Sequence, residues 1–154
     1  MIRKIKKGIL KSRLFRMDGA AVAIIQHRKG SYFITDMDSK LLWTITEKVS
    51  LHLAVKGSAG NGEGKIYLSK TSSLISPPRA ERLCLYWKEH EITIQQLDNR
   101  EMIILNQNKI IGYLTGLLRH TASIELSDTV TDGCTALLYA LADRMIHEDD
   151  VDIV

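Results

Sequence analysis

The sequence predicts a mainly β protein with one long helix, in which about twelve antiparallel strands close into a barrel around a buried C-terminal helix. Two observations lead to this fold class. Every residue from 134 to 142 is apolar except Thr135, so a helix there has no polar stripe and needs cover on all sides. Nearly everything before it reads as short strands separated by turn residues, so we expect the cover to be a sheet.

The helix is predicted over residues 132–147, because Ala and Leu are strong helix formers and Thr131 or Asp132 can accept its first free N–H groups. At about 1.5 Å per residue, such a helix is roughly 24 Å long. No stretch of the chain approaches about 18 uncharged apolar residues, so no transmembrane helix is expected.

The strands are predicted from short segments of alternating or β-branched residues that end at turn residues. Asp18-Gly19 is expected to form a two-residue hairpin turn, since a type I′ turn needs positive φ at both positions. Pro77-Pro78 cannot lie in a central strand. The predicted strands are 12–17, 20–27, 31–35, 41–46, 49–55, 65–68, 83–87, 91–97, 101–106, 109–114 and 123–126.

Residues 57–64 are rich in glycine and are predicted as a flexible connection. Gly64-Lys65 matches part of a phosphate-binding loop. The leading position of that motif is Ala59, however, and a strand rather than a helix follows. A hairpin loop is therefore the better interpretation.

Positive charge is concentrated at the start of the chain. Residues 1–16 carry seven Lys or Arg and no acid, which leaves 14 of the 21 Lys and Arg against all 18 Asp and Glu for the rest. We expect one domain, 1–154, with a basic N-terminal arm at 1–11 and an acidic C-terminal tail at 148–154. The two could attract each other, or the arm could contact phosphates.

A meander of short strands, with turns such as the one in 32–38, ends in one apolar helix at 134–146. This order resembles the tubby-like C-terminal superfamily, which includes tubby, the phospholipid scramblases and the LURP-one-related proteins. The resemblance covers residues 12–147 and is nearest to small LURP-one-like chains. It rests on the pattern of elements rather than on an invariant motif. It implies a closed barrel of about twelve strands threaded by the C-terminal helix.

The resemblance also implies a non-enzymatic role, because tubby binds phosphoinositide head groups and scramblases act at membranes. The implied module binds an anionic ligand, which is a phospholipid head group or membrane surface, or else a protein partner. The cysteine-rich palmitoylated stretch and the membrane-inserting segment of scramblases have no counterpart in this sequence. No phosphoinositide-binding Lys or Arg of tubby aligns with a particular residue.

The basic arm is the candidate binding surface. With Ile2, Ile5 and Ile9, its charged residues could form a short amphipathic element on anionic lipid. A solvated tail is the alternative for the same residues. Nucleic acid is a third interpretation, and the scattered aromatic residues suit base stacking poorly. The candidate ligand-binding residues are Arg3, Lys4, Lys6, Lys7, Lys11, Arg13 and Arg16.

No catalytic site, metal site or cofactor is predicted. The five histidines lack short metal-ligand spacing, and no G-x-S-x-G elbow occurs. The acidic pairs are better explained as turn and capping residues. An enzyme whose groups converge at the barrel mouth from distant strands remains the alternative. Two widely spaced cysteines, read as free thiols, indicate the cytoplasm, with peripheral membrane contact as an extension.

Overall fold

The computed structural model describes residues 1–28, 31–49, 52–57, 63–71, 79–87, 90–97 and 100–151. Within these residues the chain forms twelve strands followed by one helix, which confirms the predicted class of a mainly β fold with one C-terminal helix. The elements are β1 (Ile2–Lys7), β2 (Lys11–Arg16), β3 (Ala21–Arg28), β4 (Ser31–Thr35), β5 (Leu41–Val49), β6 (His52–Gly57), β7 (Glu63–Thr71), β8 (Arg79–Trp87), β9 (His90–Gln96), β10 (Met102–Asn106), β11 (Lys109–Thr115), β12 (Thr121–Leu126) and α1 (Asp132–Val151).

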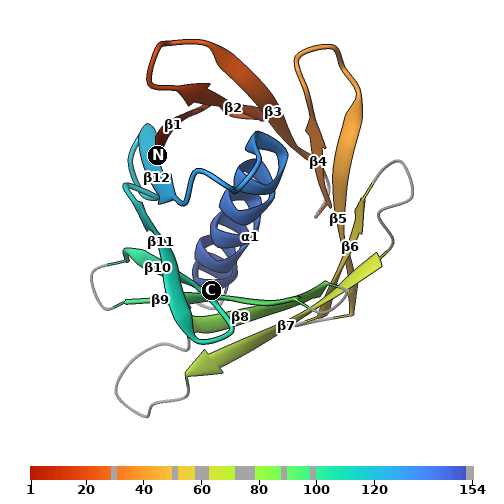
Figure 1. Ribbon diagram of the computed structural model, residues 1–154. Coiled ribbons are helices and arrows are strands. Elements are labelled where there is room, and N and C mark those ends of the chain that lie inside the picture. Colours follow the sequence, from red (N-terminus) through yellow and green to blue (C-terminus); the bar gives the residue numbers. More distant parts are fainter. Residues whose placement is uncertain are drawn as a thin grey trace.

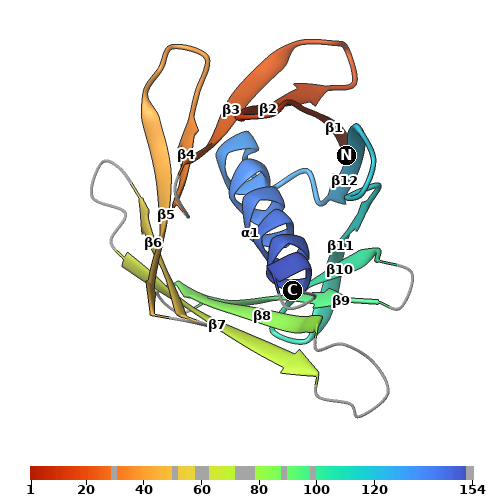
Figure 2. The same cartoon turned by 180° about the vertical axis from the view of Figure 1, so that it is seen from behind.

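Each strand pairs antiparallel with the strands next to it in the sequence, so the sheet is a continuous meander. The first and last strands also pair, since β1 lies beside β12 with Ile5 opposite Ala122. The order of pairing is β1-β12-β11-β10-β9-β8-β7-β6-β5-β4-β3-β2, and β2 pairs with β1 again. The strands surround α1 in both views of the molecule (Figures 1 and 2).

The helix packs against the inner face of this sheet. Residues 135–142 are all buried, and this run exceeds two helical turns at about 3.6 residues per turn, so every side of the helix is covered there. The predicted buried helix is therefore confirmed over its apolar run. The strands contribute inward-facing residues with 0% exposure, which include Ile5, Leu14, Ile34, Ile94, Leu114 and Ile124.

The sheet has two ends, which we name after the helix. Asp132, the first residue of α1, contacts the start of β1 and the end of β2, so this is the helix-entry end. Asp143, about three turns later, accepts a hydrogen bond from Tyr32 near the start of β4, which is the helix-exit end. The β1–β2 and β11–β12 turns lie at the helix-exit end, as do the end of β3 and the end of β9.

The helix begins where the sequence predicts and ends later. The Thr131 hydroxyl accepts a hydrogen bond from the backbone N–H of Cys134 at 3.2 Å, so Thr131 is the N-cap. The helix continues past the predicted end at His147 to Val151. No Gly or Pro follows His147 to stop it, so the first part of the predicted acidic tail is helical.

The basic segment at residues 1–11 is not a separate arm, which corrects the prediction. Residues 2–7 are strand β1, paired on one side with β12 and on the other with β2. In this strand Arg3 and Ile5 are buried while Ile2 and Lys6 are exposed, which is the alternation of a half-buried strand. Because the charged residue Arg3 occupies an inward position, the sequence of this strand lacks the usual alternation of apolar and polar residues.

The hairpin at Asp18-Gly19 has three loop residues rather than the predicted two. The backbone N–H of Arg16 donates to the carbonyl of Ala20 at 2.9 Å and closes a loop of residues 17–19. Within this loop only Gly19 has a positive φ, +91°. The loop is therefore a turn followed by one left-handed residue, the usual three-residue hairpin.

Two predictions fall outside the described residues. They are the central part of the glycine-rich connection, residues 58–62, and Pro77-Pro78. The flanking strands are described, and β6 ends at Gly57 while β7 begins at Glu63.

Candidate functional site

The seven basic residues predicted as a binding surface are divided by the pleat of β1 and β2. Successive side chains of a strand point to opposite faces of the sheet. The structure therefore does not bring the seven together. Arg3, Lys7 and Arg16 belong to the inner set, and Lys4, Lys6, Lys11 and Arg13 belong to the outer set.

The inner arginines hold the start of the helix. Arg3 Nε donates to Asp132 Oδ1, and Arg16 Nη2 donates to Asp132 Oδ2, both at 2.6 Å. Arg3 and Arg16 are opposite each other in the β1–β2 register, so one carboxylate can receive both guanidinium groups. Arg3 is only 4% exposed. Arg3 therefore serves the fold and is not available to an external ligand, whereas Arg16, whose side chain is 52% exposed, is paired with Asp132 at the surface.

The charges of this cluster shift its proton equilibria. Burial alone would raise the pKa of Asp132, but the hydrogen bonds from Arg16 and Arg3 outweigh burial, and the pKa lies below its ordinary value. The same hydrogen bond to Asp132 shifts the pKa of Arg16 in the opposite direction and raises it, because it stabilises the charged guanidinium. The cluster therefore stays ionised at neutral pH.

Lys7 faces a cavity of ≈ 340 Å³ at the helix-exit end, which Tyr32, Tyr139 and Asp143 also line. Burial lowers the pKa of Lys7, and the negative charge of Asp143 partly opposes that shift. Tyr32 donates its hydroxyl to Asp143 Oδ2 at 3.0 Å, and burial together with Asp143 raises the pKa of Tyr32. The His27 ring stacks on Tyr32 with centroids 4.3 Å apart. Several ionisable groups thus converge at this end of the sheet.

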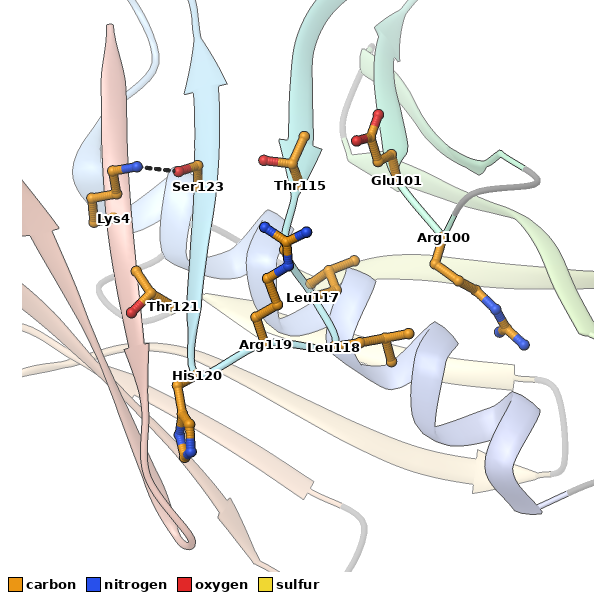
Figure 3. Close-up of a pocket in the computed structure, with 11 residues that line it drawn as sticks. Lys4, Arg100, Glu101, Thr115, Leu117, Leu118, Arg119, His120, Thr121 and Ser123 are labelled. Carbon is orange, nitrogen blue, oxygen red and sulfur yellow. Dashed lines mark hydrogen bonds between the residues drawn. The ribbon is translucent and has the colours of Figure 1, made fainter.

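A larger hollow, of ≈ 720 Å³, lies on the outer face at the helix-exit end (Figure 3). Its floor crosses three neighbouring strands, because Lys4 of β1 is opposite Ser123 of β12 and Ser123 is opposite Thr115 of β11. Lys4 Nζ donates to Ser123 Oγ at 2.6 Å, which fixes the ammonium group in the floor. Figure 3 shows Glu101, just before β10, next in the same row.

The β11–β12 turn places two more basic side chains, Arg119 and His120, at this hollow. The backbone N–H of Arg119 donates to the carbonyl of Gly116 at 3.0 Å and closes the turn. Gly116 has φ +74°, and a Cβ there would lie 2.8 Å from the carbonyl oxygen of Thr121, so glycine is required. Leu117 is buried beneath the turn and anchors it.

Basic groups outnumber acidic ones among the residues that line this hollow. Glu101 lines the hollow together with four basic residues, one of which, Arg100, donates to Gln96 Oε1 at 3.3 Å. Threonine and serine hydroxyls lie between them. Guanidinium, ammonium and hydroxyl groups are the usual donors to phosphate oxygens. We call the hollow the basic groove, after Lys4, Arg100, Arg119 and His120.

The groove contains one of the seven residues predicted from the sequence, Lys4. Arg100, Arg119 and His120 were missed, because they join Lys4 only through the pairing of β1 with β12 across more than 100 residues of sequence. Turn residues near 98–100 and 116–120 indicate hairpins. They do not reveal that β12 lies beside the first strand, with β11 and β10 next to it.

Among the described residues, no three His, Cys, Asp or Glu side chains lie close enough together to hold a metal ion. Over the same parts of the chain, no helix has the length and apolar character needed to cross a membrane. Cys84 and Cys134 are both free thiols of intermediate exposure.

With the fold and the groove in place, the chain can be compared with known proteins. No family model and no curated protein sequence matches it. Among solved structures, it is similar to an X-ray structure of a protein from Arabidopsis thaliana. The TM-score is 0.52 and the sequence identity 7%, over 96% of this chain and 90% of that chain. A likeness at this identity shows a shared fold and says nothing about a shared activity.

Proposed function

We propose that the chain is a non-catalytic binding module of the tubby-like superfamily, a closed barrel filled by its helix, that binds an anionic phospholipid head group in the basic groove. The tubby-like, LURP-one-like fold of the Arabidopsis thaliana structure supports the superfamily. The return of the strand pairing to β1 supports the barrel. That Lys4, Arg119 and His120 all line one hollow is the observation that carries the binding site.

The groove suits a phosphorylated head group in size and in chemistry. Its volume of ≈ 720 Å³ falls within the range of about 300–1,000 Å³ typical of small-molecule sites. The exposed guanidinium of Arg119 can give a phosphate two parallel N–H···O bonds. Lys6, Lys11 and Arg13 lie on the same outer face and extend the positive field. Near an anionic surface each such residue contributes about 1 kcal/mol.

Apolar side chains beside the groove favour a membrane over a free phosphate compound as the source of the ligand. Ile9 and Leu10 on the β1–β2 turn are 101% and 68% exposed, and Leu118 on the β11–β12 turn is 66% exposed. The two turns are joined, since the backbone N–H of Lys7 donates to the carbonyl of His120 at 2.9 Å. Apolar side chains surrounded by basic ones are typical of peripheral membrane contacts.

Liposome co-sedimentation of the full chain tests the proposal. The wild type should bind vesicles that contain phosphoinositide more tightly than neutral phosphatidylcholine vesicles, and added salt should weaken binding, because exposed charges are screened over about 8 Å at physiological ionic strength. Lys4→Gln with Arg119→Gln should weaken binding about tenfold or more. The charge-matched control is Lys40→Gln with Lys109→Gln, two exposed lysines at the helix-entry end. Equal binding by the two double variants would contradict the proposal.

A second pair of variants separates a membrane from a free phosphate compound. Ile9→Ser with Leu118→Ser should reduce sedimentation with vesicles and leave the affinity for a soluble inositol phosphate unchanged, since neither side chain is basic. Loss of both would place the apolar residues in the head-group site itself.

A protein with an acidic surface could use the same groove. Nucleic acid suits it less well, because none of the described residues that line it is Phe, Tyr or Trp.

An enzyme is the second candidate function, and the cavity at Lys7 is the observation that favours it. Ionisable groups with shifted pKa values in a cleft are typical of active sites, and Lys7 and Tyr32 are such groups beside Asp143. A screen of ester and phosphoester substrates with the wild type and Lys7→Met would decide between the two. Turnover that disappears in Lys7→Met would replace the binding module by an enzyme.

A further inference from the structure

Another cavity, of ≈ 420 Å³, lies beside the first half of α1 at the helix-entry end. It separates the helix from a wall built by β5, β8, β9, β10 and β11. Among the described residues, none lines both this cavity and the basic groove, so an inference from it does not depend on the proposed function. The apolar residues that line it include Trp43, Leu85, Ile92, Ile111, Leu137 and Leu138.

This cavity is open to solvent at one edge, where Thr129 and Thr131 are exposed. Its inner wall is apolar, and it has room for a small molecule, since one water molecule occupies about 30 Å³ of the liquid. The helix is packed closely elsewhere, since Ala140, Leu141 and Ala142 all have 0% exposure. A hollow with apolar inner walls favours apolar molecules, because binding removes apolar surface from water. The space beside the helix therefore suits an apolar ligand.

One polar group in the cavity lacks a partner. Asn106 Oδ1 is buried and receives no hydrogen bond from any residue that the structure describes. The backbone of Asn106 is engaged, in register with Lys109 and with Ile92, so the side chain is held in place at the end of β10. A buried amide without a hydrogen bond is unfavourable, and a ligand that supplies the bond is bound more tightly for it.

We propose that this cavity binds a small, uncharged, mainly apolar molecule with one hydroxyl group, such as an aromatic or aliphatic alcohol. The hydroxyl donates to Asn106 Oδ1, and the apolar body lies against Leu137, Leu138 and the strand wall. The ligand is uncharged because, among the described residues that line the cavity, none is Lys, Arg, Asp or Glu, and a charge would lose part of its hydration there without gaining a counter-ion. The Thr131 hydroxyl, at the polar edge, already accepts from the N–H of Cys134.

Naphthol, methoxynaphthalene and naphthoate are suitable probes, because they share one apolar body and differ in the polar group. Naphthol donates a hydrogen bond, methoxynaphthalene does not, and naphthoate is charged. Calorimetry on the full chain gives the affinities. The rate of iodoacetamide alkylation at Cys134, which lines the cavity, gives the location, with Cys84 of β8 as the internal reference thiol. Naphthol should bind most tightly, naphthoate should not bind, and naphthol should slow alkylation at Cys134 alone.

Two variants test the assignment of the hydroxyl and of the apolar body. Asn106→Leu keeps the volume and removes the acceptor, so the Kd of naphthol should rise about tenfold, the effect of one hydrogen bond, while that of methoxynaphthalene stays the same. Ile111→Phe fills the cavity and should abolish binding of both. Gln26→Leu in β3, which does not line the cavity, is the matched control and should change neither.

Three results would overturn the proposal. They are the absence of any binding of naphthol to the wild type, binding of naphthoate as tight as that of naphthol, and an unchanged naphthol affinity in both Asn106→Leu and Ile111→Phe. If Asn106→Leu does not fold, Ile111→Phe and the alkylation rates of the wild type still decide the question.

Discussion

Arg3 in β1 and Asp132 at the start of α1 are 129 positions apart in the chain and share a hydrogen bond of 2.6 Å between Nε and Oδ1. Arg16 of β2 binds the other carboxylate oxygen. The contact joins two strands to the helix and sets where the helix enters the sheet. Because Arg3 is buried, its charge depends on Asp132 for compensation.

Replacing Asp132 by Asn should lower the free energy of unfolding by about 2–4 kcal/mol, because Arg3 then keeps a buried charge without its counter-ion. Urea denaturation measures the change. Asp38→Asn is the control, since Asp38 is exposed on the β4–β5 turn and should cost no more than about 0.5 kcal/mol. Similar losses in the two variants would show that the Arg3–Asp132 contact does not stabilise the fold.

The stabilisation from Asp132 should disappear in acid. The pKa of Asp132 is lowered in the folded protein, whereas in the unfolded chain it is about 3.9. As the pH falls, the unfolded chain therefore takes up this proton first, which favours unfolding. The difference in unfolding free energy between the wild type and Asp132→Asn should be complete above about pH 4 and should shrink as the pH falls through the folded pKa. A difference that does not change with pH would contradict this.

Leu141→Ala should cost about 2–5 kcal/mol of unfolding free energy, because Leu141 has 0% exposure and its removal leaves a hole between helix and sheet. Leu118→Ala, at a 66% exposed position, is the control and should cost less than about 0.5 kcal/mol. Thermal or urea unfolding compares them. A loss below about 1 kcal/mol at Leu141 would rule out a central, packed helix.

The Lys7 amine should titrate below its ordinary value of 10.5, because burial disfavours the charged form. Asp143→Asn should lower the midpoint further, since Asp143 raises the pKa of Lys7. NMR of labelled lysine side chains follows the titration, with Lys109, exposed at the helix-entry end, as the reference signal. An upward shift in Asp143→Asn would show that the two groups do not interact as the structure places them.

The helix and most strands could be predicted because their signals are local. A helix over residues 134–142 is apolar on nearly every side and must be covered on every side. With strands predicted for nearly all of the preceding chain, this predicts a surrounding sheet. The first strand was missed for an equally physical reason. Arg3 occupies an inward position that a neutral side chain would normally hold, and it does so because Asp132 provides a counter-charge from the far end of the chain.

The candidate site could not be predicted because it depends on register. The sequence correctly marks residues 1–16 as basic, yet the pleat directs Arg3 inward to Asp132 and Lys4 outward to Ser123. Arg3 and Lys4 are adjacent in β1, and because adjacent side chains of a strand lie on opposite faces, only Lys4 is available to an external ligand. The contribution of Arg119 depends on β12 lying beside β1, and no local pattern contains that information.

The pairing of β1 with β12 has a consequence for synthesis. On the ribosome, one edge of β1 stays unpaired until its second partner, β12 (residues 121–126), has been made, and the inner face of the sheet lacks its helix until α1 follows. Until then the nascent chain exposes apolar strands and an unpaired edge, features that favour aggregation. N-terminal fragments that lack β12 and α1 should aggregate readily. The full sequence should fold slowly, because the pairing of β1 with β12 and the contact of α1 with β1 and β2 join segments that are distant in the chain.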